Sequence, residues 1–395
     1  MKHRVCIATN EFRPLTGGVG VSVDRISKLL NKAGYEVHIV FFDFDGRSLS
    51  GQQSGLMQHV PRVITQEIGC DRVLHTIVPA KEINEPNPAQ IQQQFFTHLY
   101  LLQESYSFSL FHSFYISSTG FITGLVAKQA GVPFIASIRG NDLHLQSFSQ
   151  RLSQIRWVLE NADIVTCVTD ELARLAAQIA TRTGPVLVIH NSIDPSAFAQ
   201  LVDPKGYSKL PRPVIGSSGV FKRKKGIEYF LQACLDLREE QREFSVVLVG
   251  SPLESEGNYW QTIFNEVSEK LSILVTGLVP HHQMLGALAG LDLYVASSIN
   301  DGFPNAVLEA MLAGVPIIAT KSGAMREILV DGKDAIMVEP CSSIALSQGI
   351  RSLLDDTDLR THIAKSAHDR VLTEFSPAYE QQAWSQCYSR VLGNA

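Results

Sequence analysis

The chain has 395 residues, of which 45% are hydrophobic and 18% charged, and its formal net charge is −5. This length exceeds what one hydrophobic core ordinarily organises, so two domains are predicted, and the acidic balance excludes nucleic-acid binding as the main function. The six cysteines are scattered without a C-x-x-C pair. This pattern excludes a zinc site and a disulfide framework and predicts a reducing, cytoplasmic compartment.

Membrane and export signals are also missing from the sequence pattern. No apolar run reaches the roughly 18 residues of a membrane-spanning helix, and the N-terminus lacks the layout of a signal peptide. The sequence therefore predicts no transmembrane span, while peripheral membrane contact stays open.

The first forty residues predict a strand at 4–10, a glycine-rich loop, a helix that ends at Gly34, and a second strand at 35–42. Strand, loop, helix and strand form a βαβ unit with a parallel sheet, and the same alternation recurs to about residue 193. A segment rich in Pro, Gly and Lys follows at 200–213 and is the predicted linker.

A second alternating series occupies the rest of the chain. The sequence therefore predicts an α/β protein with two doubly wound domains, at 1–200 and 201–375. Ligands of such sheets bind beyond the carboxyl ends of the strands, so the loops at strand ends are the candidate sites.

The segment INDGFPNAVLEAMLAG, 299–314, places Asp301 and Glu309 on either side of a helix start at Pro304. The backbone amides from Phe303 to Ala306 would form an anion site at the positive end of this helix. Glu309, in the second turn, would be repelled by a phosphate, so we expect it to bind ribose hydroxyls, while Asp301 reaches the group beyond the phosphate. The alternative is an acidic pair that only favours its own helix terminus.

A second candidate lies between a strand that ends at Gly219 and a helix that begins after Gly226. The loop carries four consecutive basic residues, from Lys222 to Lys225. Like charges in a row are often a solvated surface, but between a strand end and a helix start an anionic ligand would relieve their repulsion.

The glycine-rich loop of the first domain is less specific. Gly17 and Gly18 allow close approach of the backbone to a ligand, although a plain tight turn explains them equally well. The dinucleotide fingerprint G-x-G-x-x-G is incomplete, because Val23 stands where its third glycine would be. This disfavours an NAD-dependent dehydrogenase.

Three further polar residues, His112, Arg139 and Asp142, lie at or just beyond predicted strand ends. A lone histidine in such a place is more often structural than catalytic. Arg139 and Asp142 could simply pair with each other.

Together these motifs resemble those of the GT-B-fold retaining glycosyltransferases of family four (glycosyl transferases group 1). DGFPNAVLEAMLAGVPIIAT matches the acid-x7-acid motif of that family, and VIHNSID, TGLVPHHQMLGALAGLDLYVASS and KSGAMREILVDGKDAIMV resemble its other segments. The resemblance implies two Rossmann-like domains facing across a cleft. It also implies a C-terminal helix, 376–395, that crosses back to the first domain.

By the same resemblance, the protein would move a sugar from a nucleotide-sugar donor to a hydroxyl acceptor with retained configuration. Glu309 would bind the ribose, Asp301 the donor sugar, and Lys225 the leaving diphosphate. The backbone N–H groups of Phe303 and Asn305, on either side of Pro304, would assist, and Leu278 and Val279 would line the nucleobase pocket. The resemblance implies neither a metal nor another cofactor.

The sequence departs from the family pattern at three positions. Val220 stands where the family has an arginine, so Lys222 or Arg223 would supply that cation. Phe114 replaces a histidine that contacts the sugar. Arg139 replaces the histidine of the T-x-H-G segment and is assigned with Gly17, Gly18 and Gly219 to donor binding.

Two other functions stay open, a nucleotide-sugar epimerase of the same fold and a catalytically inactive sugar-nucleotide-binding protein. The acceptor class also stays open, among a glycan, a lipid-linked sugar and a small molecule. Loops at 43–60 and 80–98 are predicted to select it. The sequence does not identify the base of the donor.

Overall fold

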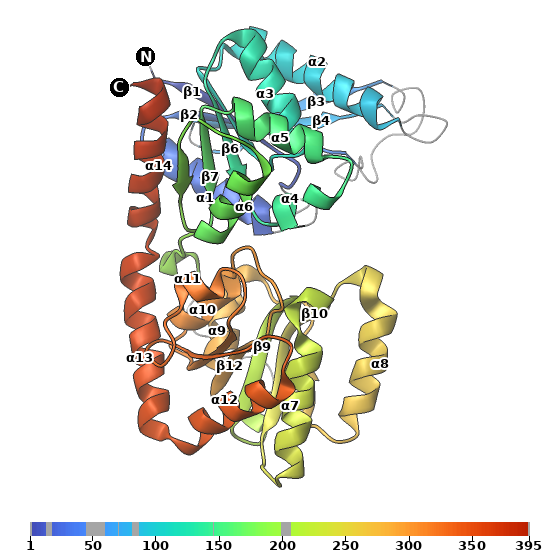
Figure 1. The fold of residues 1–395 in the computed structure, drawn as a ribbon, viewed down its shortest axis with the longest axis vertical. Coiled ribbons are helices and arrows are strands. Elements are labelled where there is room, and N and C mark those ends of the chain that lie inside the picture. The colour runs from blue at the N-terminus through green and yellow to red at the C-terminus, as the bar shows by residue number, and fades with distance from the viewer. Residues whose placement is uncertain are drawn as a thin grey trace. The chain divides into compact units, whose positions relative to one another are not determined.

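The computed structural model describes residues 2–12, 18–44, 60–69, 71–80, 87–144, 146–198 and 207–393. The chain forms two compact units, residues 1–191 with 378–395, and residues 192–377 (Figure 1). The first division comes earlier than the predicted boundary at residue 200, because Ile193 and Phe198 pack into the hydrophobic cluster of the second unit. The predicted linker is only partly described, and at its end Tyr207 is buried in the same cluster.

The described part of the first unit contains an eight-stranded sheet in the order β3-β4-β2-β1-β5-β6-β7-β8. All neighbours pair in parallel except β3 and β4, which are antiparallel. The strands are β1 (Arg4–Thr9), β2 (Glu36–Phe42), β3 (Arg62–Glu67), β4 (Arg72–Val78), β5 (Leu110–Phe114), β6 (Phe134–Ile138), β7 (Ile164–Cys167) and β8 (Val186–Val188).

Helices connect these strands and cover the sheet. They are α1 (Gly18–Lys32), α2 (Pro88–Tyr106), α3 (Ser118–Ala130), α4 (Asn141–His144), α5 (Leu152–Asn161) and α6 (Asp170–Ile179). Helix α14 (Pro377–Leu392) comes from the end of the chain, and its Trp384 and Tyr388 belong to the core of this unit with β1, β2 and β5. The N-terminal strand and the C-terminal helix lie side by side in Figure 1.

The second unit contains a six-stranded sheet within the described residues, in the order β11-β10-β9-β12-β13-β14, with every pair parallel. Its strands are β9 (Val214–Phe221), β10 (Ser245–Pro252), β11 (Ile273–Val275), β12 (Leu293–Ala296), β13 (Ile317–Thr320) and β14 (Ile336–Val338). Its helices are α7 (Ile227–Glu239), α8 (Gly257–Ser268), α9 (Met284–Ala289), α10 (Asn305–Leu312), α11 (Met325–Ile328), α12 (Ser343–Asp355) and α13 (Thr357–Glu374).

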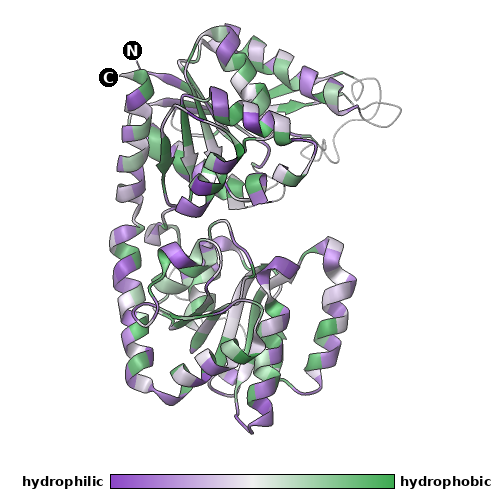
Figure 2. Ribbon diagram, in the orientation of Figure 1, coloured by the Kyte–Doolittle hydropathy of each residue, from purple (hydrophilic) through white to green (hydrophobic). Residues whose placement is uncertain are grey.

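Both faces of the second sheet are buried. Val214, Val247 and Tyr294 face one hydrophobic cluster, whereas their chain neighbours Ile215 and Val246 face the other. Side chains of a strand alternate between its faces, so a strand buried on both sides reads as a continuous apolar run. Figure 2 shows this as hydrophobic strands beneath helices whose outer faces are hydrophilic.

The predicted fold class, two doubly wound parallel-sheet domains, is therefore confirmed. The carboxyl ends of the strands carry the loops that the sequence singled out. No helix in the described ranges has both the length and the apolar character needed to cross a bilayer. Nor do three or more His, Cys, Asp or Glu side chains gather there in a group that could hold a metal ion.

Candidate functional site

The basic loop is fixed against the loop that follows β12. Lys222 precedes a 3₁₀ turn, Arg223–Lys225. The backbone N–H of Ile299 donates to the carbonyl of Lys224 at 2.8 Å, and Ser297 Oγ donates to the carbonyl of Lys225 at 2.9 Å. Gly226 has a φ of +58°, and a Cβ there would lie 2.3 Å from the Ser297 carbonyl oxygen. Only glycine permits this close approach of two backbones.

The loop after β13 holds Asp301 in the same way. Ser322 Oγ donates to the carbonyl of Ser298 at 2.6 Å. Gly323 has a φ of +49°, and a Cβ there would lie 2.3 Å from the carbonyl oxygen of Asp301. Three loops from the carboxyl ends of β9, β12 and β13 therefore stack backbone against backbone, which fixes the charged side chains that they carry.

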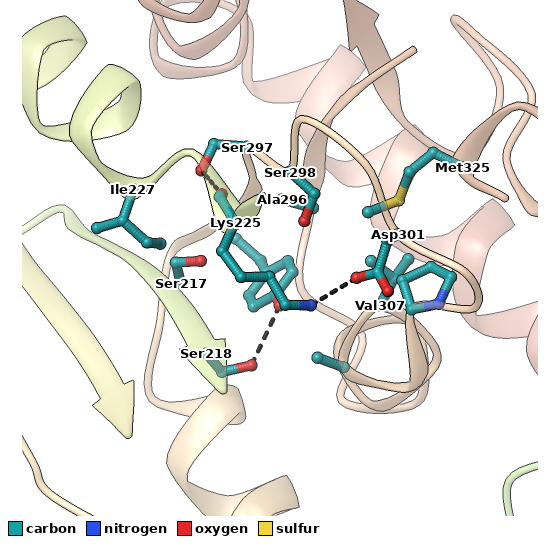
Figure 3. A pocket seen from close by; sticks show the side chains of 13 residues that line it. Ser217, Ser218, Lys225, Ile227, Ala296, Ser297, Ser298, Asp301, Val307 and Met325 are labelled. Atoms are coloured by element: carbon teal, nitrogen blue, oxygen red, sulfur yellow. Dashed lines mark hydrogen bonds and ion pairs between the residues drawn. The ribbon is translucent and has the colours of Figure 1, made fainter. Parts of the chain in front are cut away.

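Lys225 and Asp301 meet at this edge. Lys225 Nζ lies 2.5 Å from Asp301 Oδ2. Figure 3 shows the two side chains pointing toward each other, joined by a dashed line. The side chain of Asp301 is 10% exposed and that of Lys225 24%. Burial alone would raise the pKa of Asp301, but the charges of Lys225 and Lys224 outweigh it and leave this pKa lowered. The carboxylate is therefore ionised, and its partner is the lysine that the sequence predicted for the diphosphate.

The pair borders a small pocket with room for about one water molecule, about 10 Å³. Ser218 Oγ and the Tyr294 hydroxyl, 3.1 Å apart, form part of its wall, and Figure 3 shows Ser218 on the side of the pocket opposite Ser298 and Asp301. Burial raises the pKa of Tyr294, so its hydroxyl keeps its proton as a hydrogen-bond donor. Sequence reasoning did not single out either residue, because each reads as an ordinary strand position.

Helix α10 begins at Asn305, directly after Pro304, so its first amides lie beside Asp301 in the chain as predicted. Phe303 and Asn305 are half-buried. Glu309 lies in the second turn, and its Oε1 is 3.5 Å from Nε2 of His281, a contact that the sequence did not predict. In the predicted nucleobase segment, Leu278 is 78% exposed, whereas Val279 packs against the same cluster as α10.

The structure separates the two candidates for the second cation. The guanidinium of Arg223 lies 4.2 Å from the ring centroid of Tyr259, which engages it with α8. Lys222 is half-buried. Burial is the main cause that lowers the pKa of Lys224, and the charge of Lys222 lowers that pKa further. Lys222 therefore lies near the charged cluster, whereas Arg223 is held by an aromatic ring. The side chain of Val220 is 40% exposed.

Gly219, the predicted end of the strand, lies inside β9, which continues to Phe221, and has a φ of +122°. A Cβ built there has no described atom within 4 Å, whereas a Cβ on Gly250 would meet the Gly219 carbonyl oxygen at 2.0 Å. The backbone at Gly219 is therefore fixed from β10 and open on its own side, where a ligand can approach it.

The predicted residues of the first unit lie in fixed hydrogen bonds. His112 is a buried core residue, with Nδ1 2.8 Å from the Tyr388 hydroxyl and Nε2 2.6 Å from Ser137 Oγ. Burial and the charge of Arg139 hold its pKa well below the usual range, so it is a neutral structural histidine.

Arg139 and Asp142 do not pair through their side chains as suggested. The Asp142 carboxylate accepts the backbone N–H groups of Arg139, at 3.1 Å, and Gly140, at 2.9 Å. The Arg139 guanidinium lies 4.5 Å from the Phe114 ring centroid and donates to Asn191 Oδ1 at 3.1 Å. Its Nε and Nη2 are buried and find no hydrogen-bond partner among the described residues.

The glycine-rich loop is described only in part. Gly17 lies outside the described residues, and Gly18 is the first residue of α1. A Cβ built on Gly18 would have no described atom within 4 Å, so the described residues leave space at this position.

A second hollow, of about 230 Å³, lies at the carboxyl ends of β1 and β2 and the start of α3. Sequence reasoning did not identify it as a pocket. Of the loops predicted to select an acceptor, residues 45–59 and 81–86 lie outside the described residues, whereas residues 88–98 belong to helix α2 and are not a loop. The lining residues are Asn10, Phe41, Phe42, Asp43, Phe44, Ser117, Ser118, Thr119 and Arg151.

Comparisons with known proteins decide the family. Residues 16–197 match the model for Glycosyltransferase Family 4, and residues 202–370 match the model for Glycosyl transferases group 1. The chain belongs to the glycosyltransferases of family four. The 2-deoxystreptamine glucosyltransferase of Streptomyces kanamyceticus is 23% identical over 287 residues, which are 68% of this chain and 73% of that protein. The N-acetyl-alpha-D-glucosaminyl L-malate synthase of Bacillus anthracis is 23% identical over 390 residues, 96% of this chain and 95% of that protein.

Solved structures agree on the fold of this glycosyltransferase. Sucrose-phosphate synthase from Thermosynechococcus elongatus superimposes with a TM-score of 0.79 at 20% identity, covering 100% of both chains. Anabaena HepE in complex with UDP and glucose has a TM-score of 0.76 at 19% identity, covering 98% of this chain and 100% of that one. The fold is the GT-B fold of these enzymes.

Proposed function

We propose that this glycosyltransferase moves a sugar from a nucleoside-diphosphate sugar to a hydroxyl acceptor with retention of the anomeric configuration. The observation that carries the proposal is the Lys225–Asp301 pair, 2.5 Å apart at the carboxyl edge of the second sheet, directly before helix α10. The Anabaena relative in fold has been solved with UDP-glucose, which supports the same class of donor here.

Each group at this edge has a role in the proposal. Lys225 neutralises the diphosphate as it leaves, and Lys222 supplies the second positive charge in place of the arginine missing at Val220. The backbone around Pro304 at the start of α10 and the open backbone at Gly219 contact the phosphates. The charge comes from lysines and helix dipole, so the proposal needs no metal or other cofactor.

The donor sugar and nucleoside lie on either side of the phosphates. Asp301, ionised beside Lys225, accepts hydrogen bonds from sugar hydroxyls. Glu309 accepts those of the ribose, and Val279 and Leu278 contact the base. Arg139, with two nitrogens that have no partner among the described residues, is kept as the contact to the donor that the sequence implied.

In the proposed reaction, the bond from the anomeric carbon to the phosphate oxygen breaks, and a bond to the acceptor oxygen forms on the same face. The acceptor proton passes to the leaving phosphate. Such a reaction requires stabilisation of developing charge more than a protein nucleophile. We place the acceptor in the first unit, where the hollow lined by Asp43, Ser117 and Arg151 presents polar groups.

Calorimetric titration of the protein with UDP, GDP and ADP tests the donor site. We expect one nucleotide to bind and Glu309→Ala to abolish most of that affinity. The anomeric configuration of the product, read by NMR, tests retention. Change of the donor sugar without an acceptor would instead support the epimerase, and binding without turnover would support the inactive binding protein. Failure of all three nucleotides to bind contradicts the assignment of the site.

A further inference from the structure

Glu309 has a neighbour that no part of the proposed function uses. His281 lies in a short 3₁₀ turn, His281–Gln283, which leads into α9. Its Nε2 is 3.5 Å from Oε1 of Glu309, although the two residues come from different elements. The Glu309 side chain is only 12% exposed, whereas that of His281 is 53% exposed. The Glu309 side chain is thus nearly enclosed, and the histidine that it contacts is the more exposed of the two.

The imidazole is itself held in place. Its centroid lies 5.0 Å from that of Phe198, with the ring planes tilted by 32°. Phe198 and Val279 both pack against the hydrophobic cluster that contains Leu308 of helix α10. The histidine therefore rests on an aromatic ring anchored to the same core as the helix that carries Glu309.

A glutamate on a helix has several accessible rotamers, and a carboxylate that binds two ribose hydroxyls must be held in one of them. A contact of 3.5 Å is longer than a strong hydrogen bond, so it orients the carboxylate without locking it. Because His281 faces Oε1, Oε2 and the remaining lone pairs of Oε1 stay available for hydroxyl donors.

We propose that His281 is a positioning residue that, supported by Phe198, orients Glu309 for the ribose of the donor. The inference rests on the proposed function, because it takes the nucleoside to bind at Glu309. It adds a residue outside the acid-x7-acid motif to the recognition of the ribose. The chain also offers a matched control, since His282 is the next residue, is likewise exposed, and has Gln283 as its hydrogen-bond neighbour instead.

The test is calorimetric titration of the wild type, His281→Ala, His282→Ala, Glu309→Gln and the double variant His281→Ala/Glu309→Gln. The ligand is whichever of UDP, GDP and ADP the wild type binds. Loss of one orienting contact is worth about 3- to 10-fold in affinity. We expect that loss for His281→Ala, no change for His282→Ala, and no further loss when His281→Ala is added to Glu309→Gln.

The 2′,3′-dideoxy form of the same nucleotide separates positioning from general damage. It lacks both hydroxyls, so His281→Ala should not weaken its binding, whereas a distorted pocket would weaken both ligands alike. In turnover, the variant should raise the KM for the donor and leave kcat within about twofold.

Several results overturn the inference. These are unchanged or tighter binding by His281→Ala, an equal loss in the Glu309→Gln background, or an equal loss with the dideoxy ligand. Tighter binding would show that His281 occupies the ribose position and must be displaced. If the wild type binds no nucleotide, the proposed function itself fails. The wild-type titration comes first, so this failure is distinguished from a failure of the inference about His281.

Discussion

Two buried aspartates, Asp301 and Asp142, lie just beyond strand ends in the second and first units, and their pKa values shift in opposite directions. The pKa of Asp301 is lowered, because Lys225 and Lys224 outweigh the burial that would raise it. The pKa of Asp142 is raised to about 6, because burial outweighs the backbone N–H bonds from Arg139 and Gly140. The partner, and not the position in the fold, decides the direction in which the pKa shifts.

The difference extends to the surroundings. At the edge of the second sheet the charges border a pocket and keep part of their surface exposed. In the first unit, helix α14 covers a comparable set of charges. Arg25 binds Glu380 of that helix at 2.8 Å, with side chains 16% and 2% exposed. The charges of the second unit therefore stay accessible, whereas those of the first unit hold helix α14 to the rest of that unit.

The largest expected effect is the loss of catalysis on removal of the lysine. Lys225→Met should lower kcat by about 10²- to 10³-fold, as for the loss of one group that stabilises transition-state charge. The measurement is the release of nucleoside diphosphate from the preferred donor.

The matched control is Arg223→Met, from the same loop, because Arg223 stacks on Tyr259. It should change kcat by less than about threefold, since a stacked surface cation contributes little to a transition state elsewhere. Lys222→Met should fall between the two. Equal losses at all three positions would mean that the loop acts only as a diffuse positive field.

A smaller effect, on stability, is expected at the covered edge. Arg25→Met leaves the Glu380 carboxylate buried without this partner and should lower the free energy of unfolding by about 3 kcal/mol. Thermal unfolding measures it, and nucleotide affinity should stay unchanged. Arg242→Met is the control, because its partner Asp355 is 53% exposed and such pairs contribute about 1 kcal/mol or less. Lost nucleotide affinity in Arg25→Met would show that the first-unit charges also serve the ligand.

The smallest effect is a pH dependence of the first unit. His75 lies 2.8 Å from His38, and burial, aided by that neighbour, lowers the pKa of His75 from the usual 6.5 to about 4. At a pH between these two values, His75 is protonated in the unfolded chain and neutral in the folded chain. This contribution to stability is complete above pH 6.5 and is lost as the pH falls toward 4.

The measurement is hydrogen exchange of first-unit amides between pH 7 and about 4, in the wild type and in His75→Gln. The variant should show a shallower loss of protection, and His362→Gln, at an exposed position of the second unit, should match the wild type. Asp142 acts in the opposite direction, because its raised pKa favours the folded state at low pH. The quantity to compare is therefore the difference in protection between the wild type and His75→Gln at each pH. Parallel pH profiles of the two proteins would rule out His75 as the cause of the pH dependence.

The sequence predicted the second unit well because its signals are local. Alternating apolar strands and helices fix a parallel sheet, and the carboxyl ends of parallel strands meet at one edge. Lys225 and Asp301 are 76 residues apart in the chain and still meet, as that rule requires. The pairing of β3 with β4 was not predicted, since β3 is half-exposed and carries no continuous apolar run.

Other features depend on tertiary contacts that leave no periodic signal. The stacking of Arg223 on Tyr259 and the approach of His281 to Glu309 each join two elements through side chains alone. The end of the first domain was placed too late, because Ile193 and Phe198 look like loop residues in the sequence yet pack into the second core.

The discontinuity of the first unit has a practical consequence for recombining such enzymes. Residues 192–377 form one uninterrupted segment, whereas the first unit needs both 1–191 and 378–395. A gene fragment that stops before residue 378 would encode the first sheet without Trp384 and Tyr388, and so with part of its core missing. The unit that we propose binds the donor can therefore be exchanged as one segment with two junctions, whereas the first unit must supply the chain on both sides of that segment.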